Sequence, residues 1–181
     1  MIQKAAILST GDELTTGRTL DTNANFISDK LVAAGMDVTS IIVVGDYPER
    51  IRWAWHAAMR QAEVIVSTGG LGPTADDLTT ETVAQVTGRA LVMNQAVADR
   101  IRQMFEAMGR VMPENNLKQA QFPEGAEIIS NALGTAPGFR LDIHTEHGAR
   151  HLIVLPGVPR EMKPMIEEQV LPWLARARGT N

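Results

Sequence analysis

The chain has 181 residues, of which 44% are hydrophobic, 21% charged and 4% aromatic, close to the averages of a single soluble domain. Its 17 basic and 21 acidic side chains give a net charge of −4, so the basic excess that nucleic-acid-binding proteins use is absent. The sequence has no cysteine, which excludes disulfides, thiolate metal sites and a cysteine nucleophile. No apolar run reaches the roughly 20 residues that span a bilayer, and no signal peptide is recognised. We expect a cytoplasmic domain with no nucleic-acid or membrane partner.

The first half of the chain alternates between apolar, strand-like runs and helical patterns. This alternation is typical of parallel strands joined by crossover helices. The patterns predict strands at residues 4–9, 38–44 and 64–66. They predict helices between Asp21 and Gly35, over residues 49–61 and over residues 78–86, where Gly88 follows the last helix.

The second half is less regular. The patterns predict a helix over residues 95–108, a short helix over 115–121, short strands joined by turns over 125–141, a buried strand over 151–155 and a closing helix over 161–174. Pro164 is expected in the first turn of the closing helix and Pro172 near its end. Together these elements predict one three-layer α/β/α sandwich with a mostly parallel sheet at residues 1–175, followed by a C-terminal tail at residues 176–181.

Glycine and acidic residues follow four of the predicted strands, in the segments 9–13, 45–46, 68–77 and 156–161. Parallel strands end at the same edge of a sheet, where ligands bind between the loops and the helix N-termini. The repeated placement of these residues predicts a ligand site at that edge.

The glycine-rich segment 68–77 permits positive φ angles and a close approach of backbone amides to an anion such as a phosphate. A tight connection from a strand to a helix is the alternative interpretation. The segment is neither GxGxxG nor a Walker A motif, because no lysine follows its last glycine. A Rossmann dehydrogenase and a P-loop NTPase are therefore disfavoured.

Asp76 and Asp77 have two interpretations. They can act as helix-capping and first-turn acids, which favour the positive end of a helix. However, Asp12, Glu13 and Asp46 are expected at the same edge, and these carboxylates would repel one another unless a divalent cation joined them. A magnesium-type site for a phosphorylated ligand resolves this repulsion without histidine or cysteine.

Other candidates are weaker. His144, His147 and His151 are expected to be solvated polar residues near a turn, and the cluster of Asn115, Asn116, Lys118 and Gln119 is expected to cap a helix. Trp53, Trp55 and Trp173 are expected in the core or in an interface between subunits.

Six motifs resemble, in order, the N-terminal domain of the competence/damage-inducible CinA family. They are STGDEL at residues 9–14, DTNAN at 21–25, VGD at 44–46, TGGLGPTADDLT at 68–79, ENNLKQA at 114–120 and LPGVPREM at 155–162. The resemblance covers nearly the whole chain. It implies the MoaB/Mog molybdopterin-binding fold and closed homo-oligomers, either dimers or trimers.

The resemblance also implies an activity. CinA-type domains are metal-dependent pyrophosphatases that split ADP-ribose into AMP and ribose 5-phosphate, with Mg²⁺, Mn²⁺ or Co²⁺ as the expected cofactor, and a related domain hydrolyses FAD. The Mog branch adenylylates molybdopterin. A molybdopterin- or nucleotide-binding module, adenylylating or without catalysis, is therefore the alternative function. Many CinA proteins continue into a deamidase domain, and deamidase activity is not expected for a sequence that ends at Asn181.

Residue roles follow from the matched motifs. Asp77 and Asp46 match catalytic acids of the Mog branch, Asp76 belongs to the CinA-type pattern, and Asp76 and Asp77 are the expected metal ligands. Leu71 stands where the Mog loop usually has threonine, which disfavours molybdopterin adenylylation. The expected substrate-binding residues are Thr10, Gly11, Asp12, Glu13, Asn23, Asn25, Thr68, Gly69, Gly70, Gly72, Pro73, Thr74, Asn116, Lys118, Pro156, Gly157 and Glu161.

Overall fold

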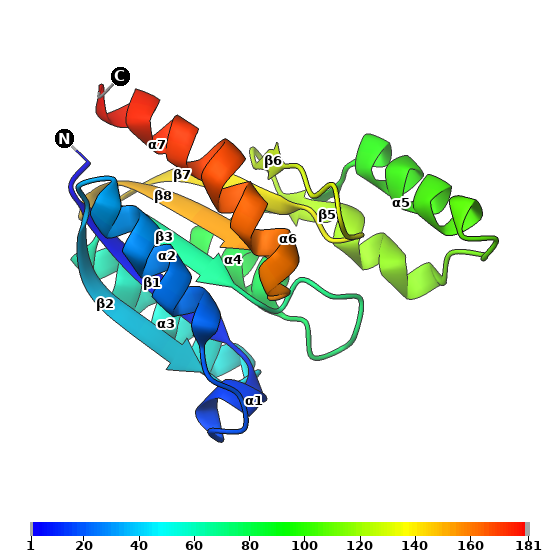
Figure 1. The fold of residues 1–181 in the computed structure, drawn as a ribbon, viewed down its shortest axis with the longest axis horizontal. Coiled ribbons are helices and arrows are strands. Elements are labelled where there is room, and N and C mark those ends of the chain that lie inside the picture. Colours follow the sequence, from blue (N-terminus) through cyan, green and yellow to red (C-terminus); the bar gives the residue numbers. More distant parts are fainter. Residues whose placement is uncertain (1, 180–181) are drawn as a thin grey trace.

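The structure, a computed structural model, describes residues 2–179 and contains a six-stranded sheet between two layers of helices (Figure 1). In sheet order the strands are β2 (Asp37–Val44), β1 (Lys4–Thr10), β3 (Val64–Thr68), β8 (Gly148–Leu155), β7 (Gly138–Thr145) and β6 (Glu127–Ile129). The first four strands are parallel, β7 is antiparallel to β8, and β6 is antiparallel to β7. The predicted three-layer sandwich with a mostly parallel sheet is confirmed.

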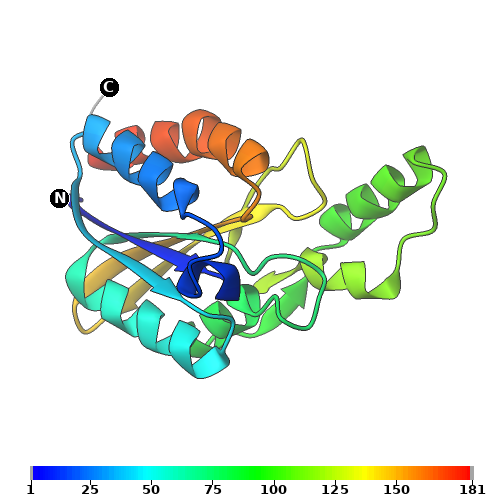
Figure 2. The same cartoon turned by 60° about the horizontal axis from the view of Figure 1, so that its bottom comes forward.

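Helices cover both faces of this sheet (Figure 2). One face carries α2 (Thr22–Ala33), α6 (Pro159–Met165) and α7 (Leu171–Arg178), and the other carries α3 (Pro48–Gln61) and α4 (Thr79–Thr87). Alternate strand residues face opposite layers. In β1, Ile7 therefore joins the core beneath α2, whereas Leu8 joins the core beneath α3, where Trp55 is completely buried.

The hairpin of β7 and β8 extends beyond the predicted short strands. β7 continues to Thr145, and a turn at Glu146 and His147 connects it to β8. The expectation of a solvated polar residue is wrong for His151, which is half-buried, lies 2.9 Å from the Asp142 carboxylate and packs edge-on against Trp173.

A lobe projects from one side of the sheet in both ribbon views (Figures 1 and 2). It contains α5 (Gln95–Ala107), the 3₁₀ helix η1 (Glu114–Ala120) and a two-stranded sheet of β4 (Leu91–Met93) and β5 (Gln121–Pro123). The small sheet was not predicted, because three-residue strands nearly thirty residues apart leave no recognisable pattern. The one-turn helix α1 (Asp12–Thr15) was not predicted either.

The C-terminal helix departs from its prediction. A π-helical segment, η2 (Ile166–Val170), separates α6 from α7. Pro172 therefore lies in the first turn of α7, whereas the prediction placed it near the C-terminal end of one closing helix. The wider π turn accommodates a proline that cannot donate a backbone hydrogen bond. α7 continues through residues 176–178, which the prediction assigned to the tail, and the Arg178 guanidinium donates to the carbonyls of Ile2 and Gly35.

Residues 180–181 of the predicted tail and Met1 of the predicted domain lie outside the described residues. In the described range 2–179, no helix combines the length and apolarity needed to cross a membrane.

Candidate functional site

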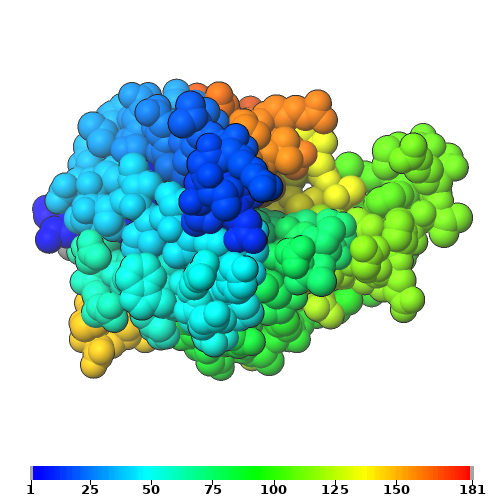
Figure 3. Space-filling view, turned by 90° about the horizontal axis from the view of Figure 1, so that it is seen from below, coloured from blue at the N-terminus to red at the C-terminus, as the bar shows by residue number. Residues whose placement is uncertain are grey.

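A cavity of about 490 Å³ lies at the carboxyl ends of β1, β3 and β8, where the predicted loops meet. The space-filling view from below shows this hollow between the green, yellow and orange segments (Figure 3). Predicted site residues that line it are Thr10, Gly11, Glu13, Asp46, Gly69, Gly70, Gly72, Thr74, Asp76, Asp77, Pro156, Gly157 and Glu161. Leu71, Gln119, Thr135, Ala136 and Val158 also line it and were not assigned to the site from the sequence.

The glycine loop adopts a conformation that side chains would not tolerate. Gly69 and Gly70 have φ angles of 101° and 67°, a region that favours glycine. A β-carbon on Gly69 would lie 2.6 Å from the carbonyl oxygen of Thr10. The Thr79 hydroxyl donates to the Gly69 carbonyl at 2.9 Å, so α4 holds the loop in place.

Asp12 and Asp46 join the ends of β1 and β2. The amide of Asp12 donates to the Asp46 carboxylate, and the amide of Asp46 donates to the Asp12 carboxylate, both at 3.1 Å. Burial raises the pKa of Asp46, and the negative charges of Asp12, Glu13 and Asp77 raise it further against the opposing effect of the hydrogen bond. The structure therefore brings the predicted acids of three loops into mutual electrostatic contact.

Asp77 closes a turn of the glycine loop. Its Oδ2 atom accepts hydrogen bonds from the amide and hydroxyl of Thr74 at 2.9 and 2.6 Å. The N-cap residue of α4 is Leu78, which makes no side-chain cap, so Asp77 is not the predicted helix cap. The Asp76 side chain is exposed at the rim of the cavity.

Residues of η1 support the glycine loop from behind. The Lys118 ammonium donates to the carbonyls of Thr74 and Asp77 and forms an ion pair with Glu81 at 3.0 Å. The Gln119 amide donates to the Leu71 carbonyl at 3.2 Å. These bonds connect the projecting lobe to the loop.

The other predicted binding residues, which include Pro73, Asn116 and Asn25, do not line this cavity. Asn116 is buried and donates to the Gln119 side chain, and the Pro73 carbonyl accepts from Asn115. Asn116 therefore supports its neighbour instead of capping the helix. Asn25 is exposed on α2 and lines neither the main cavity nor the smaller one beside it.

The smaller cavity, of about 130 Å³, adjoins the main one and shares Thr10, Glu13, Gly69 and Gly157 with it. Asn23 and Thr68 line this smaller cavity. The Asn23 amide donates to the Thr68 hydroxyl at 3.0 Å and to the Gly157 carbonyl at 2.7 Å, which ties the end of β3 to the loop after β8.

The charged side chains in the described lining of the main cavity are all acidic. Five carboxylates line it, from Glu13, Asp46, Asp76, Asp77 and Glu161, and its described lining contains no lysine, arginine or histidine. Within residues 2–179, no three acidic or histidine side chains already form a metal-binding group. Mg²⁺ needs only one or two carboxylates when phosphate oxygens and water complete its shell. The donor set therefore fits a cation that is held jointly with a phosphorylated ligand.

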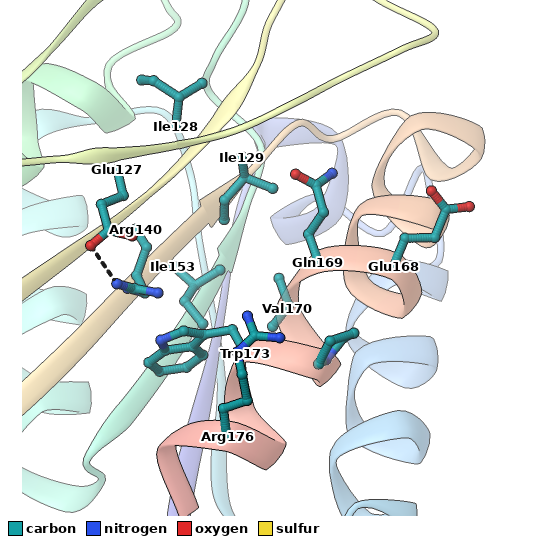
Figure 4. Close-up of a pocket in the computed structure, with 11 residues that line it drawn as sticks. Glu127, Ile128, Ile129, Arg140, Ile153, Glu168, Gln169, Val170, Trp173 and Arg176 are labelled. Carbon is teal, nitrogen blue, oxygen red and sulfur yellow. Dashed lines mark ion pairs between the residues drawn. The ribbon is translucent and has the colours of Figure 1, made fainter. Parts of the chain in front are cut away.

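Another cavity, of about 290 Å³, lies between α7 and the β6–β7 edge (Figure 4). The Arg140 guanidinium pairs with Glu127 at 2.7 Å and stacks 4.6 Å from the centre of the Trp173 ring. Two of its charged residues, Glu127 and Arg140, are thus paired with each other, and its lining also includes the apolar Ile129 and Ile153. Without a glycine loop or converging acids, this cavity is a weaker candidate for catalysis.

The three-layer sandwich with a glycine loop and acids at its parallel-strand edge agrees with the MoaB/Mog-type domain that the motifs imply. Residues 6–176 match the family described as "Probable molybdopterin binding domain". The chain belongs to this molybdopterin-binding domain family, and its sequence relatives are CinA proteins.

The CinA-like protein of Syntrophomonas wolfei is 45% identical over 175 residues, covering 97% of this chain and 41% of the relative. The CinA-like protein of Kosmotoga olearia is 42% identical over 176 residues, covering 97% and 42%. This chain spans about two fifths of the length of these curated relatives.

Solved structures agree with the fold. The protein CinA from Thermoplasma acidophilum superposes with a TM-score of 0.81 at 34% identity, covering 94% of this chain and 98% of that one. The tungsten cofactor synthesizing protein MoaB from Pyrococcus furiosus has a TM-score of 0.63 at 18% identity, covering 98% of each chain. At that low identity the likeness to MoaB concerns the fold alone.

Proposed function

We propose that this domain is a metal-dependent pyrophosphatase that hydrolyses ADP-ribose, or a similar adenylyl pyrophosphate such as FAD, to AMP and a second phosphate product. The observation that carries the proposal is the lining of the main cavity. A glycine loop suited to phosphate oxygens lies beside five carboxylates without a positively charged side chain in the described lining. An anionic pyrophosphate can enter such a cavity only together with a cation.

The protein groups have separate tasks in this proposal. The amides of the glycine loop bind phosphate oxygens, and Asp76, Asp77 and Asp46 hold or organise the cation. A divalent metal, when bound, neutralises the pyrophosphate and makes its phosphorus more susceptible to attack by water. Lys118 binds loop carbonyls instead of the cavity, so it maintains the loop shape and leaves the cavity without a fixed positive charge.

The test is turnover by purified protein. ADP-ribose and FAD are each incubated with Mg²⁺, Mn²⁺ or Co²⁺, and AMP release is followed by chromatography. We expect AMP from at least one pair, and no AMP after addition of a chelator. Binding of ADP-ribose without turnover under all metals would contradict the pyrophosphatase proposal.

A second candidate function is a module that binds molybdopterin or a nucleotide, without catalysis or for adenylylation. The observation that favours it is the Asp77 carboxylate, whose Oδ2 atom already accepts two bonds from Thr74. Such a module is expected to gain about 2.7 kcal/mol of stability at a hundredfold excess of ligand over Kd. Calorimetry with ADP-ribose, AMP and molybdopterin, combined with product analysis, separates the two functions.

A further inference from the structure

Glu161 enters the main cavity from a different side than the other acids. It lies in the first turn of α6, after β8, whereas Asp46 follows β2 and Asp77 belongs to the loop after β3. The orange segment that contains Glu161 and the green segment that contains the glycine loop lie on two sides of the hollow (Figure 3).

A single buried side chain holds the Glu161 carboxylate. Asn131 is 1% exposed, and its amide nitrogen donates to Oε2 of Glu161 and to the Ala136 carbonyl, both at 2.8 Å. Its amide oxygen accepts from the amides of Leu133 and Gly134 at 3.0 Å. Because every side-chain hydrogen-bonding group of Asn131 has a partner, its orientation is well determined.

Gly134 gives the same carboxylate its space. A β-carbon at Gly134 would overlap the carboxylate of Glu161. The φ angle of Gly134 lies outside the positive range, so alanine would fit the backbone and displace only the end of the Glu161 side chain.

The arrangement also reaches the projecting lobe. Arg100 of α5 donates through its guanidinium to the backbone carbonyl of Asn131. Asn131 is therefore bonded to α5 through its backbone carbonyl and to Glu161 through its side-chain amide. Through Arg100 and Asn131, the projecting lobe contacts Glu161 of the cavity by a route that does not involve the Lys118 hydrogen bonds.

The acids of the cavity differ in the hydrogen bonds that their carboxylates accept. Asp77 receives two hydrogen bonds on one oxygen, and Asp46 receives one from Asp12 and is surrounded by other negative charges. Glu161 receives one bond on Oε2, and its Oε1 atom has no hydrogen-bond partner among residues 2–179. Asp46 and Asp77 also keep an Oδ1 atom without a hydrogen-bond partner among residues 2–179, but both residues are assigned to the cation in the proposed function. Glu161 is then an oriented carboxylate that can act as a general base, which needs a free oxygen within reach of the attacking water.

We propose that Glu161 accepts the proton of the attacking water, and that Asn131 is the positioning residue that fixes the Glu161 carboxylate. The inference rests on the proposed hydrolysis. The oxygen of water forms a bond to one phosphorus as the bond from that phosphorus to the bridging oxygen breaks. One water proton passes to Oε1 of Glu161, and the second phosphate group leaves with the bridging oxygen. Attack and departure lie roughly in line in phosphoryl transfer, which suits a base that stands apart from the Asp46 and Asp77 side.

The test compares kcat and KM for ADP-ribose in Glu161→Gln, Asn131→Asp and Gly134→Ala. A lost general base lowers the rate by about 10²-fold or more. We expect Glu161→Gln to lose at least that factor in kcat and Gly134→Ala to lose about tenfold, with KM within twofold of the wild type. Binding of AMP, measured by calorimetry with the activating metal present, is expected to stay within twofold.

Leu133→Ala is the matched control, because Leu133 is exposed on the same segment and its backbone bond to Asn131 remains. Asn131→Asp places a second carboxylate next to Glu161 and can reduce folding stability, so Gly134→Ala provides an independent displacement of the Glu161 carboxylate.

A higher KM with unchanged kcat in Glu161→Gln would make Glu161 a binding residue and overturn its role as the general base. A wild-type kcat in Gly134→Ala would show that the position of the Glu161 carboxylate does not affect the rate, and would overturn the positioning role of Asn131. If the wild type hydrolyses neither ADP-ribose nor FAD, the proposed function fails and the general-base role of Glu161 fails with it.

Discussion

The Asp77 carboxylate combines a structural role in the glycine loop with a proposed chemical role. Its Oδ2 atom closes the turn with Thr74, and the side chain lines the main cavity. An amide oxygen can accept the same two hydrogen bonds, but an amide lacks the negative charge that a metal ligand supplies. The two roles can therefore be separated by one substitution.

For Asp77→Asn we expect the fold to be kept, with the free energy of unfolding within about 0.5 kcal/mol of the wild type. We expect kcat to fall by about 10²-fold or more, because the charge is lost from the proposed metal site. Thermal unfolding and AMP release measure the two effects. Normal turnover in this variant would return Asp77 to a purely structural role.

Asp46 is predicted to weaken the fold at neutral pH. Its pKa is raised above the ordinary value of 3.8, by burial and then by the neighbouring acids against the hydrogen bond from Asp12. The folded state therefore holds this proton more tightly than the unfolded state, and the free energy of unfolding falls as pH rises from 3.8 through the raised pKa.

Asp46→Asn removes this titration and keeps an oxygen for the Asp12 amide. In the presence of a chelator, we expect the variant to unfold at a higher temperature than the wild type at pH 7, with a difference that shrinks toward pH 4. Thermal unfolding across this pH range is the measurement. An advantage that grows toward acid pH would contradict a raised pKa for Asp46.

At the scale of elements, a carboxylate outside the site joins two parts of the sheet. Glu63, just before β3, accepts hydrogen bonds from the amides of Lys4 at 2.7 Å and Gln3 at 3.2 Å, at the start of β1. Burial alone would raise the pKa of Glu63, but these hydrogen bonds and the charge of Arg150 outweigh it and hold the pKa below the ordinary value of 4.5. The contribution is fully present above pH 4.5 and is lost as pH falls through the lowered pKa.

For Glu63→Gln we expect a loss of about 0.5–1 kcal/mol at pH 7, since bonds to a charged acceptor become bonds to a neutral one in a partly solvated place. The difference from the wild type should shrink as pH falls below 4.5. Urea unfolding at pH 7 and pH 3.5 tests this, with Glu124→Gln on the exposed loop after β5 as control. Equal destabilisation at both pH values would show that charge is not the cause.

At the scale of the molecule, apolar side chains remain exposed around the β2 edge of the sheet. Trp53 of α3 is 59% exposed and Ile41 of β2 is 49% exposed, whereas Trp55 is fully buried. The two tryptophans therefore divide between surface and core. An outer strand of eight residues with unpaired backbone groups and apolar neighbours is suited to contact another copy.

We predict a closed homo-oligomer, either a dimer or a trimer. Light scattering is expected to give two or three times the subunit mass of 19.7 kDa. Trp53→Lys should lower that mass if the β2 side forms the contact, whereas Trp173→Lys on the opposite side of the sheet should not. A wild-type mass of 19.7 kDa at high concentration would defeat the prediction.

The sequence by itself determined the layers and the edge of the sheet at which the candidate site lies. Local periodicity carries this information, because a strand or a helix shows its buried face within a few residues. Glycine and acidic residues after positions 9, 44, 68 and 155 indicated one edge of the sheet, because parallel strands end at the same edge. The motif series identified the family, and the comparisons confirmed it.

Only the tertiary structure decided which side chains support the site and how. Lys118 donates to a carbonyl of the glycine loop, and Asn116 donates to Gln119, which bonds the same loop. Asn131, which no motif contained, donates to Glu161 from thirty residues away. The π turn before Pro172 and the sheet of β4 and β5 were also beyond local patterns. Such contacts join positions far apart in the chain, and their partners are selected by packing of the whole domain, which no window of sequence contains.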